Sequence, residues 1–197
     1  TLIDGRLATG DEVQIVPGSI RARIRGLQTH KVNVSEARPG ARVAANLSGV
    51  STDALERGQV LTKPGGVEQT TLIDARLTLL ANAPGPLKHN AMVDFYSGAA
   101  HVAAHVRLLD TQRLEPGTSG WVQFRLSRPV AVARGDRYVV RQASPSLTLG
   151  GGGVVQPHPR RRYKRFRPDL LARLEALSHG APEEVLIQLL GQSRVLD

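Results

Sequence analysis

Residues 99–109, which read AAHVAAHVRLL, are the stretch that decides the fold class of this chain. Two sets of side chains alternate along it, with Val102, Ala104, Val106 and Leu108 on one side and His101, Ala103, His105 and Arg107 on the other. A period of two, apolar on one face, is typical of an antiparallel strand that covers a core with that face only. Residues 121–126 repeat the alternation. The pattern therefore predicts a mainly β fold.

The composition agrees with many short strands. The 197 residues include 20 Gly and 12 Pro, which favour frequent turns, and a hydrophobic fraction of 41% is enough for a buried core. Cysteine is absent, which excludes disulfides and thiolate metal sites. No apolar run reaches the roughly 18 residues of a membrane span, and the first residues lack the layout of a signal peptide. We therefore expect a cytoplasmic protein with no membrane partner.

Turn signals divide the chain into three stretches. Short apolar runs up to Thr62 are punctuated by Gly and Pro, which predicts a first small barrel or sandwich. Residues 63–66 (KPGG) read as a linker before a second series of strands that begins near Thr71. Gly10-Asp11 and Gly135-Asp136 each stand just before an expected strand, so the halves share a turn. Two similar barrels in tandem would explain this repeat.

The third stretch differs in kind. Residues 160–167 (RRRYKRFR) carry six cations, and a helical period follows from Pro168. Leu170, Leu171, Leu174 and Leu177 fall on one helical stripe, which Gly180 can end. A second short helix is expected from Pro182 to Gly191. Two helices of this size do not make a stable domain, so we interpret them as part of a larger helical module.

The charge points to an anionic partner. The chain has 26 Lys+Arg against 17 Asp+Glu, a net charge of +9, which favours nucleic acid before a membrane surface, although charge alone does not choose between them. The candidate RNA-binding residues form two groups: Arg21, Arg23 and Arg25 along one strand, and Arg160, Arg161, Arg162, Lys164 and Arg165 in the basic tract. Alternate residues of a strand stand about 6.8 Å apart, close to the spacing of successive phosphates. A solvated outer face and a solvated linker are the simpler interpretations of the two groups.

No catalytic or metal site is predicted. Gly150 to Gly153 is followed by Val154-Val155-Gln156 rather than by the Lys and Ser or Thr of a phosphate-binding loop, so a flexible connection or a strand close to another backbone is expected. His101 and His105 have the spacing of a zinc helix but lie in a strand pattern, where two exposed histidines are expected. No Gly-x-Ser-x-Gly sequence marks a nucleophile.

Several motifs recur in order along the chain. In the first half they include Gly10-Asp11-Glu12-Val13, Gln28-x-His30 and Gly40-x-Arg42-Val43-Ala44. In the second half they include Gly135-Asp136-Arg137-Tyr138 and Thr148-Leu149-Gly150-Gly151-Gly152. Together they resemble domains 2 and 3 of a translational GTPase. The Gln28-x-His30 and Gly40-x-Arg42 details are most similar to the selenocysteine-specific elongation factors, whose C-terminal winged-helix region the last two helices resemble.

The resemblance implies the domain organisation and the partners. It implies a translation-factor domain 2 β-barrel at residues 1–64, a domain 3 β-barrel at 67–156, and a basic linker with a partial winged-helix domain at 157–197. A member of this family carries selenocysteyl-tRNA to the ribosome and binds an mRNA hairpin through its last winged helices. GTP and Mg²⁺ are expected on a GTPase domain outside these residues, so the chain itself is expected to be non-catalytic. By its place in the motif, Arg42 matches an arginine of the family's selenocysteine pocket.

Two other functions stay open at this point. A general elongation factor of the factor Tu type would carry ordinary aminoacyl-tRNAs, although the glycine-rich exit and the appended helices count against it. A stand-alone basic β-barrel RNA-binding module would explain the charge without any tRNA chemistry. An uncharacterised hydrolase has only scattered histidines in its favour.

Overall fold

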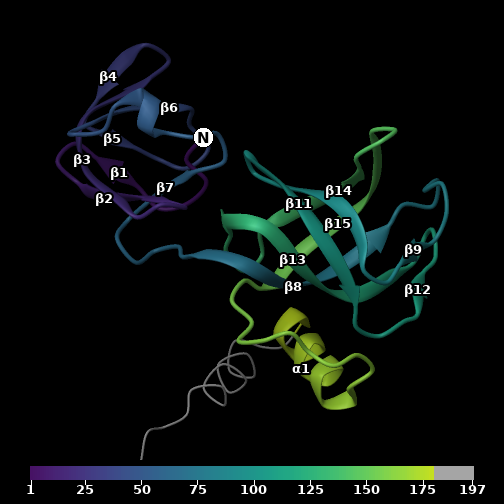
Figure 1. The fold of residues 1–197 in the computed structure, drawn as a ribbon. Helices are drawn as coiled ribbons and strands as arrows, with labels where there is room; N and C mark the ends of the chain where they lie inside the picture. The colour runs from purple at the N-terminus through teal and green to yellow at the C-terminus, as the bar shows by residue number, and fades with distance from the viewer. Residues whose placement is uncertain (180–197) are drawn as a thin grey trace, which may run out of the picture. The chain divides into compact units, whose positions relative to one another are not determined.

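The computed structural model describes residues 1–179 and divides the chain into two compact units, with the boundary between Gln69 and Thr70 (Figure 1). Both units consist mainly of β-strands, as the alternating pattern predicts. The second predicted helix, from Pro182 to Gly191, lies outside the described residues.

The first unit surrounds a small core with short strands. Its elements are β1 (Leu7–Ala8), β2 (Glu12–Val16), β3 (Ile20–Thr29), β4 (Val32–Val34), β5 (Glu36–Ala37), β6 (Val43–Leu47), the 3₁₀ turn η1 (Thr52–Ala54) and β7 (Val60–Thr62). The sheet order is β4-β3-β2-β7, with β6 also paired to β3, while β1 pairs with β5. The buried core consists of Leu7, Val13, Ile24, Leu27 and Ala37.

Strand β3 holds this unit together because it pairs with β2, β4 and β6. Exposed and more buried residues alternate along it as far as Ile24, and the register against β6 then shifts between Ile24 and Gly26. An extra residue of this kind is a β-bulge, which bends a strand and reverses the faces of the residues after it. Arg25 is that residue, so Leu27 is buried although it is an odd number of residues from Ile24.

The second unit is a closed six-stranded barrel in the order β10-β11-β13-β8-β15-β14. Its strands are β8 (Gln69–Leu79), β10 (Ala91–Ser97), β11 (Ala100–Leu108), β13 (Ser119–Ala131), β14 (Arg137–Gln142) and β15 (Leu147–Gln156). A two-stranded ribbon of β9 (Leu87–Lys88) and β12 (Arg113–Leu114) accompanies it. The stretch that decided the fold class is β11, with Val102, Ala104, Val106 and Leu108 all buried.

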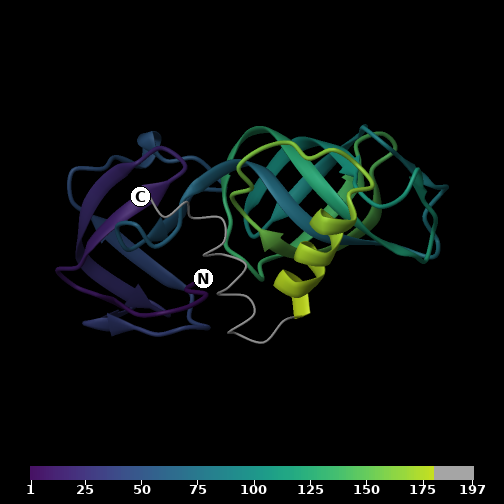
Figure 2. The same ribbon diagram turned by 90° about the horizontal axis from the view of Figure 1, so that it is seen from below.

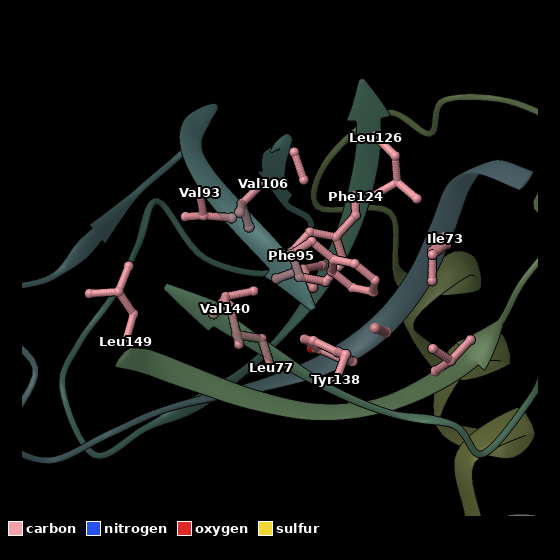
Figure 3. Close-up of a cluster of buried hydrophobic side chains, with 14 of the residues drawn as sticks. Ile73, Leu77, Val93, Phe95, Val106, Phe124, Leu126, Tyr138, Val140 and Leu149 are labelled. Carbon is pink, nitrogen blue, oxygen red and sulfur yellow. The ribbon is translucent and has the colours of Figure 1, made fainter. Parts of the chain in front are cut away.

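Three aromatic rings fill the middle of this barrel (Figure 3). The ring centroid of Phe95 lies 5.2 Å from that of Phe124 and 5.2 Å from that of Tyr138. The Tyr138 hydroxyl donates a hydrogen bond to the carbonyl oxygen of Arg76 at 2.7 Å. Burial raises the pKa of Tyr138 well above its ordinary value, so this hydroxyl keeps its proton and remains a donor.

The glycine run 150–153 is the middle of strand β15. A Cβ at Gly150 would overlap the carbonyl oxygen of Thr78, and a Cβ at Gly152 would overlap that of Arg76. The two glycines therefore let β15 lie against β8 more closely than side chains allow. Of the two alternatives for this run, the strand close to another backbone is correct.

The turn that the two halves share is the same in both. The side chain of Asp11 accepts a hydrogen bond from the backbone N–H of Ala8 at 2.9 Å, and that of Asp136 accepts one from Ala133 at 2.8 Å. Gly10 and Gly135 precede them with φ of 96° and 89°, a conformation that favours glycine. The Gly-Asp pair thus forms the turn that leads into β2 in one unit and into β14 in the other.

The helix α1 (Pro168–His179) covers part of the outside of the second barrel, as both views of the ribbon show (Figures 1 and 2). Its Leu170, Leu174 and Leu177 pack with Trp121, Leu109 and Val155 in a second apolar cluster. The Arg134 guanidinium donates a hydrogen bond to the carbonyl oxygen of Leu177 near the C-terminal end of the helix. The first predicted helix is therefore confirmed.

Candidate nucleic-acid interface

The basic tract, residues 160–167, is attached to the second barrel by its backbone. The carbonyl oxygen of Arg161 accepts a hydrogen bond from Gln123 Nε2 at 3.1 Å, and that of Tyr163 accepts one from Arg107 Nε at 2.9 Å. The N–H of Phe166 donates to the carbonyl oxygen of Leu109 at 2.7 Å. The backbone of the tract is thus hydrogen-bonded to the barrel wall.

Arg165 differs from its neighbours because its guanidinium binds the protein. Nε donates to the carbonyl oxygen of Leu108 at 2.9 Å, and Nη2 donates to the carbonyl oxygen of Thr111 at 2.6 Å. A further contact joins Nη2 to Oε1 of Gln112 at 3.2 Å. These bonds satisfy carbonyl groups at and just after the end of β11, so Arg165 anchors the tract.

Four cations of the tract are presented to solvent. Arg160, Arg161, Arg162 and Lys164 are exposed, and their side chains make no hydrogen bond or ion pair with another residue in the described range 1–179. Arg167, in contrast, forms two hydrogen bonds with the Asp169 carboxylate, at 2.9 and 2.8 Å, which lower the pKa of Asp169. Of the six cations in the tract, these four are therefore available to a polyanion, because Arg165 and Arg167 are bound within the protein.

The aromatic residues of the tract are engaged within the protein. Tyr163 is half-buried, and its hydroxyl accepts a hydrogen bond from Arg173 of α1 at 2.8 Å. The Arg173 guanidinium also lies 5.1 Å from the centroid of the Tyr163 ring. Phe166 stays partly exposed, with the Arg165 guanidinium 4.6 Å from its centroid. Tyr163 therefore helps to dock the tract on α1, and only Phe166 offers an accessible ring.

A buried polar network lies beneath the tract. Asp74 on β8 is fully buried, and its Oδ1 accepts a hydrogen bond from Gln123 Nε2 at 2.8 Å. The same amide nitrogen binds Arg161, and the Gln123 oxygen lies 3.4 Å from the Tyr163 N–H. Burial raises the pKa of Asp74 to about 7, against the opposing effects of the Gln123 hydrogen bond and the Arg173 charge. Gln123 thus connects a buried carboxyl to the backbone of the tract.

Arg21, Arg23 and Arg25 of the first unit are all exposed on β3. Arg23 pairs with Glu12 of the neighbouring strand at 3.0 Å, with both side chains more than half exposed. Arg25 is the bulge residue of β3. Exposed pairs of this kind contribute little stability, so Arg23 can exchange Glu12 for another anion at small cost.

Arg42 is exposed immediately before β6 and takes no ion-pair partner within residues 1–179. Glu36, the nearest candidate partner by sequence, pairs instead with Arg6 and with Arg38, each at 3.3 Å. The Arg42 guanidinium is therefore available to an anionic ligand.

The two histidines of β11 lie on the outer face of the barrel. The imidazole of His101 stacks on the ring of Tyr96 with centroids 4.3 Å apart, and its Nε2 lies 3.4 Å from Asp94. His105 Nδ1 lies 3.3 Å from the carbonyl oxygen of Asn90. No group of three or more candidate metal ligands occurs in the described part of the chain.

Each of the two units is similar to a known protein family. The family model described as "Elongation factor Tu domain 2" matches residues 1–62. The model described as "Selenocysteine-specific elongation factor, beta-barrel domain" matches residues 74–161. A selenocysteine-specific elongation factor from Desulfomicrobium baculatum is 38% identical over 187 residues, which are 95% of this chain and 29% of that protein. This chain is homologous to the selenocysteine-specific elongation factors.

The matched regions of this elongation-factor homologue contain most of the candidate residues. The domain 2 match includes Arg42 and the β3 arginines, while the barrel match ends at Arg161, inside the basic tract. The chain spans less than a third of the length of the relative. Among the described residues, no helix is long and apolar enough to cross a membrane.

Sequence reasoning missed the residues that hold the tract in this homologue. Gln123 and Arg107 occupy the outward positions of β13 and β11, where the alternating pattern predicts ordinary solvent contact. Asp74 and Arg173 are isolated charges in the sequence with no motif around them. The one available signal was the polarity of Gln123, which interrupts the apolar neighbourhood of residues 121–126.

Proposed function

We propose that this chain is the aminoacyl-tRNA-binding part of a selenocysteine-specific elongation factor. In the full-length factor it would bind selenocysteyl-tRNA for delivery to the ribosome at recoded UGA codons, in the cytoplasm. GTP and Mg²⁺ would bind a GTPase domain elsewhere in that factor, and an mRNA hairpin would bind its C-terminal winged helices. The chain itself would supply binding surfaces and no catalytic group.

The observation that carries this proposal is the match of residues 74–161 to the barrel of selenocysteine-specific factors, in the expected order after a domain 2 match. A general elongation factor of the factor Tu type would explain the first match but not the second. A stand-alone RNA-binding barrel would explain neither the order nor the 38% identity over 95% of the chain.

The tRNA backbone is the partner that suits the exposed part of the basic tract. Arg160, Arg161, Arg162 and Lys164 project from a segment whose own backbone is held by the barrel, so the backbone loses little freedom on binding and only the side chains become ordered. Each phosphate that a cation neutralises releases counterions and steepens the salt dependence of binding. These four residues would therefore provide affinity without reading sequence.

The experiment replaces the four residues with Gln and measures tRNA binding at several salt concentrations. Each lost phosphate contact lowers the magnitude of the logarithmic salt slope by about 0.7 to 0.9. Loss of all four contacts should therefore lower it by about 3. The control replaces the exposed Arg6, Arg57, Lys63 and Arg113, which changes the net charge equally. Equal losses in the two variants would show that only the net charge matters, and the tract would not be an RNA contact.

Arg42 is proposed to contact the selenocysteyl group. A selenol is mostly ionised at neutral pH whereas a serine hydroxyl is not, so a cation distinguishes the two by charge rather than by size. One ion pair at about 4 Å and an effective dielectric constant near 20 is worth at most ~4 kcal/mol before desolvation. This corresponds to a preference of up to several hundred-fold.

The test places Arg42→Ala in the full-length factor and compares selenocysteyl-tRNA with seryl-tRNA on the same tRNA. We expect the preference for selenocysteyl-tRNA to disappear with seryl-tRNA binding almost unchanged. Arg38→Ala is the matched control, since Arg38 is an exposed arginine just before the Pro39–Gly40 turn. Equal weakening of both tRNAs by Arg42→Ala would assign Arg42 a general role instead.

A further inference from the structure

A second group of cations lies where the basic tract crosses the end of β11. Arg107 comes from β11, Arg162 and Arg165 come from the tract, and His89 lies between β9 and β10. Arg165 Nε donates to the carbonyl oxygen of Leu108 and Arg107 Nε donates to that of Tyr163, which places the tract against the barrel strand. His89 lies within electrostatic range of Arg165, Arg107 and Arg162. Residues far apart in the sequence thus meet at one point.

The Arg107 guanidinium is only partly used by the protein. Its Nε donates to the carbonyl oxygen of Tyr163, which fixes the direction of the side chain. Its two terminal nitrogens have no partner within residues 1–179, and neither of them is buried. They are therefore donors in a fixed orientation that face solvent beside the exposed Arg162.

Within residues 1–179, no carboxylate forms an ion pair with Arg107, Arg162 or Arg165. Burial lowers the pKa of Arg107, and the charges that lower it further are those of Arg162 and Arg165. Burial also lowers the pKa of His89, and Arg165, Arg107 and Arg162 add to the effect. The Nδ1 atom of His89 is buried without a hydrogen-bond partner in the described range. Like charges held together without a counter-charge leave a positive potential that an anion would relieve.

We propose that Arg107 and Arg162, with His89 beside them, form a binding subsite for one phosphate group of the RNA backbone. The inference rests on the proposed tRNA-binding function and adds to the tract a contact from the barrel wall. A guanidinium with two free terminal nitrogens binds phosphate oxygens in a planar, two-pronged geometry. Arg165 is the positioning residue, since its bonds to Leu108 and Thr111 hold the tract beside Arg107.

The first arm of the test compares Arg107→Gln with Arg125→Gln in tRNA binding. Gln at position 107 removes the charge and keeps an N–H donor for the Tyr163 carbonyl. Arg125 is an exposed arginine on the adjacent strand β13, so its replacement changes the net charge equally. We expect Arg107→Gln to weaken binding about tenfold, the value of one hydrogen bond to a charged group, and to lower the salt slope by about one contact. Arg125→Gln should leave both quantities unchanged.

The second arm follows the imidazole resonance of His89 by NMR during pH titrations without ligand, with inorganic phosphate and with tRNA. An anion bound among the cations should raise the pKa of His89, an effect that a merely structural Arg107 would not produce. If inorganic phosphate raises the pKa of His89, the subsite binds a single free phosphate. If tRNA raises this pKa and inorganic phosphate does not, the phosphate must be part of the RNA chain. Either result supports the proposal.

The outcomes separate this inference from the proposed function. Where the tract variant weakens tRNA binding, equal effects of Arg107→Gln and Arg125→Gln, or a His89 pKa that does not move in the tRNA complex, would overturn the phosphate subsite and leave the proposed function standing. Where no variant changes tRNA binding, the tRNA proposal is rejected. The subsite is then retained only if inorganic phosphate raises the His89 pKa in the parent chain and not in Arg107→Gln.

Discussion

Asp74 has an unusual environment for a carboxyl group. It is fully buried, one oxygen is bonded to Gln123, and the other has no partner among the described residues. Its pKa of about 7 lies above the ordinary 3.8, so the folded state keeps a proton that the unfolded chain releases between these values. The contribution of Asp74 to the free energy of unfolding is therefore highest below pH ~4 and falls as the pH rises towards 7.

Asp74→Asn should remove this pH dependence. Linkage over about three pH units gives at most ~4 kcal/mol of stability lost by the parent chain between pH 4 and pH 8, and Asn avoids that loss. We expect the variant to be more stable than the parent at pH 8 and similar to it near pH 4, in urea unfolding. Glu175→Gln, which removes an exposed negative charge, is the control. A parent stability that does not change between pH 4 and pH 8 would contradict the prediction.

At the scale of single residues, the sequence predicts charge but not its use. The cations of the tract are visible in the sequence, and the exposure of Arg160, Arg161 and Arg162 agrees with a solvent-facing role. The anchoring role of Arg165 was not predictable, because its acceptors belong to residues more than fifty positions away. A side chain's partner depends on tertiary structure, which a local pattern does not contain.

Among the elements, strand β15 requires glycine at some positions of its glycine run and not at others. Gly152→Ala should destabilise the second unit, because its Cβ would overlap the Arg76 carbonyl of the adjacent strand. Overpacking of this kind typically costs ~1–3 kcal/mol and more where backbone must move. Gly153→Ala is the matched control, since nothing lies within 4 Å of its Cβ position. Thermal unfolding should separate the two variants, and equal melting temperatures would be inconsistent with the close packing of β8 and β15.

Helix α1 offers a direct optical test. Trp121 is the single tryptophan of the chain and is buried beneath Leu170, Leu174 and Leu177. Leu174→Arg should undock the helix and shift the Trp121 emission to longer wavelength, because a charge without a partner is not tolerated in an apolar cluster. Ala172→Arg places the same side chain on the exposed face of α1 and should leave the emission unchanged. Identical spectra for the two variants would contradict the packing of α1 on Trp121.

The strand pattern predicted the barrel interior better than its exterior. Alternation placed Val122, Phe124 and Leu126 on the core side, and all three are buried there. The same alternation assigned Trp121 and Gln123 to the outer face, yet both are buried because α1 and the tract cover them. A period of two distinguishes the faces of a strand but does not show what packs on the outer one.

For the whole molecule, the two units have separate cores of different size. The main buried cluster of the first unit consists of Leu7, Val13, Ile24, Leu27 and Ala37, whereas the barrel core includes the aromatic cluster of Phe95, Phe124 and Tyr138. Smaller cores bury less apolar surface per residue and are less stable. The domain limits 1–64, 67–156 and 157–197 stay a prediction, and the stability of each part can be measured.

Calorimetry of the chain should therefore resolve two transitions. The unit Thr1–Gln69 should unfold first, with an enthalpy of roughly 50 kcal/mol near 60 °C, and the barrel unit should follow with a larger one. Val13→Ala should lower the first transition only, and Phe124→Ala the second only, since each residue is fully buried in one core. A single transition that both variants shift would show that the units unfold together.

The side chains that attach the basic tract to the barrel are different from those that the tract exposes to solvent. Gln123, Arg107 and Arg165 fix its backbone, while Arg160, Arg161, Arg162 and Lys164 contribute nothing to that attachment through their side chains. During evolution the second set can exchange Arg for Lys, or lose a charge, without a penalty to folding. Homologues should therefore vary at the positions of Arg160, Arg161 and Lys164 according to their RNA, and should keep the holding residues even where the RNA differs.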